Sequence, residues 1–95
     1  MTRVTARYGR DGYGIVSIGH AGTPESCTAV SAILWALAGW CQNNVGSFRM
    51  GRGAARITMP RIAGADAVMD LAVIGLMQVQ KAAPDDVRVE IVNET

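Results

Sequence analysis

The only histidine of this 95-residue chain lies seven positions before one of its two cysteines. His20 stands in a Gly-His-Ala-Gly segment, and Cys27 opens a Cys-Thr-Ala-Val-Ser segment that ends at Ser31. An imidazole that takes the proton of a thiol creates a nucleophilic thiolate, which is the pairing used in cysteine-dependent acyl transfer. Taken separately, Cys27 also fits a small buried apolar residue and His20 an exposed turn residue. Their joint placement makes them the candidate catalytic residues.

The sequence around Cys27 predicts the start of a helix. Thr23 can cap the first amides, Pro24 fits the first helical position, and Glu25 puts a carboxylate in the first turn. We expect this helix to run to about Asn43. Its unpaired amide hydrogens and the positive end of its dipole would favour a thiolate at Cys27 and could hold an oxyanion.

Two nearby residues could support the pair. Ser31 lies one helical turn after Cys27, where its hydroxyl could donate to the thiolate or to a substrate oxygen, or could bond its own backbone. Glu25 could orient His20, or could complement the helix dipole.

The residues that flank this segment predict strands and a second helix. Alternation from Val4 to Tyr8, a turn at Asp11-Gly12 and a strand at 13–19 indicate an antiparallel hairpin that ends next to His20. A third strand is expected at 54–59, with room for a short partner before it. Helical spacing over 66–82 predicts the second helix, with one face made of Val68, Leu71, Ala72, Gly75 and Val79.

The last strand is expected to place Val87, Val89 and Ile91 on its inner face. The resulting β-β-α-β-α-β order predicts an α+β fold, a two-layer sandwich with a mostly antiparallel sheet and both helices on one face. The length fits a single domain over residues 1–95.

Composition excludes several classes of protein. Apolar residues make up 49% and charged residues 18%, values typical of a folded globular chain. The longest apolar stretch, 32–40, is too short to cross a bilayer, and no secretory signal is visible, so we expect a cytoplasmic protein with no membrane partner. The net charge of +1 argues against nucleic acid as a partner. A local basic strip, Arg49, Arg52, Arg56 and Arg61, is better explained by solubility than by nucleic-acid binding.

The cysteines point neither to a disulfide nor to a metal site. Cys27 and Cys41 would lie on one helix, about 21 Å apart along its axis, which exceeds the reach of a disulfide. One histidine and two cysteines at this spacing match no zinc pattern. We therefore expect no metal and no cofactor.

The His20 and Cys27 motifs, together with the later Gly75-Leu76, Pro84-Asp85 and terminal strand, resemble the ribosomal-processing cysteine protease family. The resemblance implies a catalytic dyad of His20 and Cys27, with Ser31 matching the motif serine. It also implies a homodimer, and a protein substrate: the N-terminal extension of a large-subunit ribosomal protein or, for phage-borne relatives, of a virion protein. The connecting loop receives the substrate in that family; its residues here are Gly19, Ala21, Gly22 and Thr23.

This chain departs from the family in two ways. The loop between histidine and cysteine is shorter, and Pro24 replaces the family's aspartate. These departures motivate a second hypothesis, a catalytically inactive binding or assembly module of the same fold.

Overall fold

The computed structural model describes residues 1–20 and 22–94, which form five strands and two helices. In chain order these are β1 (Thr2–Tyr8), β2 (Gly12–Ile18), α1 (Pro24–Asn43), β3 (Ser47–Gly51), β4 (Ala54–Pro60), α2 (Ala65–Ala82) and β5 (Val87–Asn93). No helix in this described part of the chain is long and apolar enough to span a membrane.

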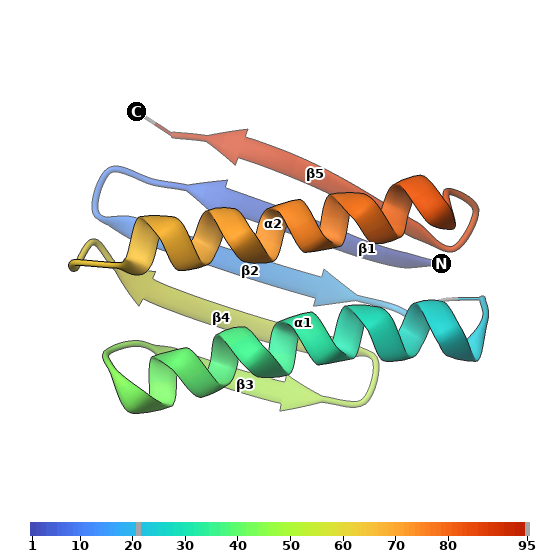
Figure 1. The fold of residues 1–95 in the computed structure, drawn as a ribbon, viewed down its shortest axis with the longest axis horizontal. Coiled ribbons are helices and arrows are strands. Elements are labelled where there is room, and N and C mark those ends of the chain that lie inside the picture. The colour runs from blue at the N-terminus through green and yellow to red at the C-terminus, as the bar shows by residue number, and fades with distance from the viewer. Residues whose placement is uncertain (21, 95) are drawn as a thin grey trace.

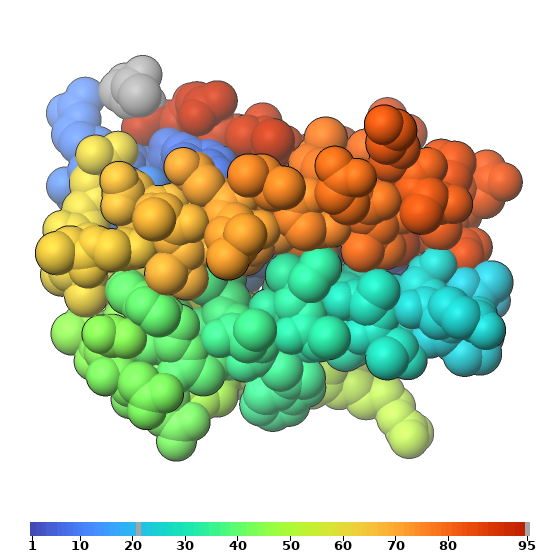
Figure 2. Space-filling model, viewed as in Figure 1, coloured from blue at the N-terminus to red at the C-terminus, as the bar shows by residue number. Residues whose placement is uncertain are grey.

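The strands form one mixed sheet in the order β3-β4-β2-β1-β5. Three of its four pairings are antiparallel, and β5 joins β1 in parallel. Both helices lie on the same face of this sheet, side by side (Figure 1), and they cover much of the sheet in the view from that side (Figure 2). The predicted α+β sandwich is therefore confirmed, with β3 as the additional strand ahead of β4.

Local sequence signals account for the elements that hold the candidate residues. The hairpin of β1 and β2 turns at 9–12, where the Gly9 amide donates to the Gly12 carbonyl at 2.8 Å. Helix α1 begins at Pro24 after the Thr23 cap and ends at Asn43, as predicted. Its buried side includes Val30, Leu34, Leu37 and Cys41, which pack on the sheet.

The predicted inner face of α2 is only partly confirmed. Ala72 is buried, and Val68 and Val79 pack half-buried against the core, but Leu71 is 71% exposed. The helix also buries Ala65, Met69, Val73 and Leu76. Helix α2 is apolar on more than one side. The side that packs against the sheet is the one that includes the large side chains of Met69 and Leu76.

On β5 the register places Val87, Val89 and Ile91 on the inner face, as predicted, beside Thr2, Val4 and Ala6 of β1. Val87 is buried, whereas Ile91 is 47% exposed because it lies toward the far end of an edge strand.

The other face of the sheet carries no helix (Figure 1). Alternation along the strands sends arginine, hydroxyl and small side chains to this open face.

Candidate active site

The start of α1 is held by a network of hydroxyl groups. The Thr23 side chain accepts a hydrogen bond from the Ser26 amide at 3.3 Å, and the two hydroxyl oxygens lie 3.0 Å apart. Ser26 is buried, with 7% of its surface exposed. The predicted threonine cap is confirmed, and it fixes the turn that carries Cys27.

Asp86 ties this helix start to the beginning of β5. Its Oδ2 atom accepts hydrogen bonds from the hydroxyls of Thr23 and Ser26, each at 3.1 Å. Its backbone carbonyl accepts a hydrogen bond from the Thr2 amide at 2.9 Å, and a Cβ on Gly22 would clash with its Oδ1. One residue at the far end of the sequence thus contacts both the loop after His20 and the helix that carries Cys27.

Cys27 lies half-buried in the first turn of α1 with a free thiol. Its amide donates to the Thr23 carbonyl at 3.1 Å, and the Ser26 amide is bonded to the Thr23 hydroxyl. These two amides are already paired, so an oxyanion at this helix start requires other donors.

His20 is exposed and follows β2 through Gly19, whose φ is +98°. The Gly19 amide donates to the Gly53 carbonyl at 2.8 Å, which fixes the exit of β2 against the β3–β4 turn. Gly53 has a φ of +76°, and a Cβ built on it would be 2.8 Å from Nε2 of His20. The imidazole therefore lies close against the backbone of Gly53, and any residue other than glycine at this position would require the His20 ring to move.

His20, Cys27 and Ser31 line one cavity of about 580 Å³, together with Gly19 and Thr2. Its remaining walls are mostly apolar and come from α1 and from the β3–β4 hairpin: Val30, Leu34, Trp35, Met50, Gly51, Arg52, Gly53, Ala54 and Ala55. The cavity is therefore a mostly apolar recess whose polar lining residues are Cys27, His20, Ser31, Thr2 and Arg52.

The other predicted residues lie elsewhere. Glu25 is exposed, and in the described part of the chain no hydrogen bond or ion pair joins it to His20; it stands in the first turn of α1, where a carboxylate complements the helix dipole. Gly22 and Thr23 contact Asp86 outside the cavity. Ala21 lies outside the described residues.

Among the hydrogen bonds of the described residues, none joins the thiol of Cys27 to the imidazole of His20. Catalytic hydrogen bonds are often long before substrate binds. Formation of the pair therefore requires a movement of the His20 side chain or of its loop.

The second thiol differs from the first. Cys41 is buried on α1, with 2% of its surface exposed, and burial raises the pKa of its thiol. Both cysteines are free, as their positions on one helix predicted. Within residues 1–20 and 22–94, no group of three His, Cys, Asp or Glu side chains is placed to hold a metal ion.

Sequence reasoning missed two residues of this region, Gly53 and Asp86. The Gly-Arg-Gly turn and the Pro-Asp-Asp segment were visible as local signals. Their contacts with His20 and Ser26 span more than 30 positions, and no spacing rule reports such contacts.

Comparison with solved structures identifies the fold. No family model matches the sequence, and no curated protein matches it significantly. The essential ribosomal processing protease Prp of S. aureus, in complex with a covalently linked product peptide, superposes with a TM-score of 0.82 at 14% identity, covering 96% of this chain and 99% of that one. This chain has the fold of Prp.

Other solved structures agree with the Prp fold. SMU.848 of Streptococcus mutans superposes with a TM-score of 0.80 at 18% identity, over 99% of this chain and 96% of that one. Prp with a substrate peptide gives a TM-score of 0.77 at 12% identity, over 96% and 99%. The fold likeness extends over nearly the whole of each chain.

Proposed function

We propose that this protein is a cysteine endopeptidase in which His20 and Cys27 form the catalytic pair. The observation that carries the proposal is that these two residues, from different elements, line the same recess. Prp, whose fold this chain shares, is a protease observed with bound peptides. The proposal places the protein in the cytoplasm, where its thiol stays reduced.

In the proposed reaction His20 removes the proton of Cys27, and the thiolate attacks a peptide carbonyl carbon. The tetrahedral intermediate collapses to a thioester as the amine leaves with a proton from the imidazolium. Water, activated by the neutral His20, then hydrolyses the thioester and restores the thiol. The position of Cys27 in the first turn of α1 supports the thiolate, because the positive end of the helix dipole stabilises negative charge there.

The proposed substrate is an N-terminal segment of a ribosomal protein or of a virion protein. Peptides from the N-termini of candidate proteins should be incubated with the protein and analysed by mass spectrometry. We expect cleavage of one peptide bond, absent in Cys27→Ala and reduced of the order of 10²-fold in His20→Ala. If no peptide is cut, the result favours the inactive binding module. If Cys27→Ala cuts equally well, Cys27 is not the nucleophile and the proposed pair is wrong.

We also propose a homodimer that forms through the helix layer. Leu71 and Ile74 on α2 are 71% and 57% exposed, and Trp35 on α1 is 57% exposed. Large apolar side chains exposed on neighbouring helices are typical of an interface. Leu71→Glu combined with Ile74→Glu should convert a dimer into a folded monomer in analytical ultracentrifugation. A dimer that survives both changes would exclude α2 from the interface.

A further inference from the structure

The open face of the sheet concentrates positive charge. It carries five exposed arginines and two glutamates in a chain of net charge +1: Arg3, Arg7, Arg49, Arg56, Arg88, Glu90 and Glu94. The basic strip seen in the sequence is split by folding. Arg61 packs over the Tyr13 ring, with its Cζ atom 5.3 Å from the ring centroid. Arg52 lines the cavity that contains His20. The cluster on the sheet is therefore a product of strand pairing.

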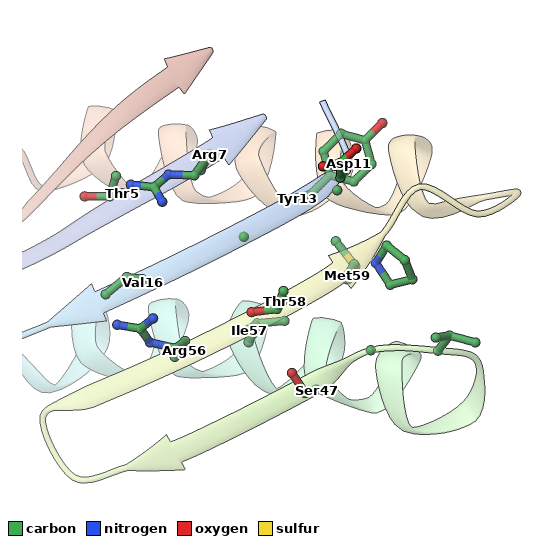
Figure 3. Close-up of a pocket in the computed structure, with 15 residues that line it drawn as sticks. Thr5, Arg7, Asp11, Tyr13, Val16, Ser47, Arg56, Ile57, Thr58 and Met59 are labelled. Carbon is green, nitrogen blue, oxygen red and sulfur yellow. The ribbon is translucent and has the colours of Figure 1, made fainter. Parts of the chain in front are cut away.

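These arginines border a trough that runs along β2. The outward residues of β2, Gly14, Val16 and Ile18, are uncharged and form its floor. The β1 arginines stand on one side and Arg56 of β4 on the other, across two strand spacings or roughly 10 Å. A hollow of about 640 Å³ lies over this floor, between Arg7 and Arg56 and beside the hydroxyls of Thr5 and Thr58, and its lining also includes Asp11 from the turn before β2 (Figure 3).

The arginines alternate between the two walls in regular steps. Arg3 is level with Ile18, Arg56 with Val16, and Arg7 with Gly14. Each step along the trough is two residues, roughly 7 Å. The trough thus presents one guanidinium per step, from alternate sides.

The same register creates unfavourable pairs. Arg49 lies directly opposite Arg56, and Arg3 lies beside Arg88. Like charges that face each other across strands destabilise a sheet. A polyanion in the trough would relieve both repulsions, whereas the ion pair between Arg7 Nε and Glu94 Oε1, at 2.9 Å, neutralises only one of the three trough arginines.

We propose that this trough binds the sugar-phosphate backbone of a single-stranded nucleic acid. A phosphodiester chain carries one anion on every backbone unit whatever its sequence, so it can meet each of the regular steps of Arg3, Arg56 and Arg7; a peptide does so only where its acidic residues alternate. Arginine and threonine side chains are the usual phosphate contacts in such complexes. The outward residues of the five strands include no aromatic ring, so bases are not stacked and binding is indifferent to sequence.

The test is fluorescence anisotropy with a labelled oligothymidylate. We expect a Kd of about 10⁻⁵ M at low salt that weakens steeply as the salt concentration is raised. Combining Arg3→Gln with Arg56→Gln should weaken binding at least about tenfold and flatten the salt dependence. Lys81→Gln on α2 and Cys27→Ala should bind as the wild type does, and circular dichroism checks that every variant is folded.

Three results would overturn the proposal. One is an absence of binding at low salt, and another is equal weakening by Lys81→Gln, which would indicate bulk charge alone. The third is displacement of the oligonucleotide by polyglutamate at equal charge concentration, which would assign the face to an acidic protein. None of these outcomes depends on peptidase activity.

Discussion

The backbone of Gly53 supports the imidazole of His20, with space for a hydrogen but not for a methyl group at its Cα. This contact joins the β3–β4 turn to the exit of β2, and the hydrogen bond from Gly19 to Gly53 strengthens the same junction. The β3–β4 turn therefore helps to set where the proposed base stands.

Gly53→Ala is expected to displace His20. Its φ of +76° costs an alanine about 1–2 kcal/mol, and its Cβ would press on Nε2. We expect the rate of peptide cleavage to fall at least about tenfold. The free energy of unfolding should fall only by the backbone cost of about 1–2 kcal/mol. Gly51→Ala is the matched control, since its Cβ would meet Ala54 O at 3.5 Å. If the two variants cleave the peptide at the same rate, the contact between Gly53 and His20 does not contribute to cleavage.

Iodoacetamide should modify Cys27 near neutral pH and leave Cys41 unmodified until the protein unfolds. The burial of Cys41 and the raised pKa of its thiol account for its protection. Greater exposure alone would make Cys27 react faster than Cys41. The decisive comparison is therefore between the alkylation rates of Cys27 in the wild type and in His20→Asn. The rate in His20→Asn should be lower by about tenfold if the imidazole deprotonates the thiol. Equal alkylation of both thiols in the folded wild type, or no effect of His20→Asn, would exclude the dyad.

The phenol of Tyr8 should ionise only at strongly alkaline pH. The pKa of Tyr8 is raised to about 12. Burial is the largest cause, and the 2.8 Å hydrogen bond to Asp70 and the charge of that carboxylate are smaller ones. The stability contributed by neutral Tyr8 is fully present below about pH 10, its usual pKa, and is lost as the pH rises through 12. Ultraviolet titration of Asp70→Asn should show a lower pKa for Tyr8, still above 10 because burial remains. Asp66→Asn is the control; identical titrations of both variants would mean that Tyr8 and Asp70 do not interact in solution.

Asp86→Ala should destabilise the protein by about 1–3 kcal/mol, because the buried Ser26 hydroxyl loses its acceptor. Asp86→Asn keeps an acceptor oxygen and should recover much of this loss in urea denaturation. The control is Asp85→Ala at the exposed neighbouring residue, which should leave the free energy of unfolding almost unchanged. A loss in Asp85→Ala as large as that in Asp86→Ala would contradict the specific role of the network.

The sequence was informative where the signal was local. Asp11-Gly12 predicted the hairpin, and Thr23-Pro24-Glu25 predicted the start of α1. The inner face of α2 was predicted only in part: Ala72 is buried, but Leu71 is exposed. Apolar residues lie on more than one side of that helix, so packing decides which side is buried. Strand β3 was only suggested, since its residues are exposed or half-buried and show little alternation.

Long-range contacts could not be predicted. The spacing of His20 and Cys27 predicted that the two residues lie near each other, and both line one cavity. Gly53 comes close to His20 only through the pairing of β2 with β4. The cluster of arginines on the open face likewise depends on register, because a shift of one residue would send Arg3 and Arg7 into the core.

The parallel pairing of β1 with β5 has a consequence for the order of folding. It joins the first strand to the last, and the contacts of Asp86 with Thr23 and Ser26 span 63 and 60 positions. Closing so long a loop costs entropy that local hairpins do not incur, so contacts of this separation form slowly. We therefore expect the turn that carries Cys27 to be secured late, after the hairpin and α1 have formed, so that the thiol acquires its final surroundings when β5 docks.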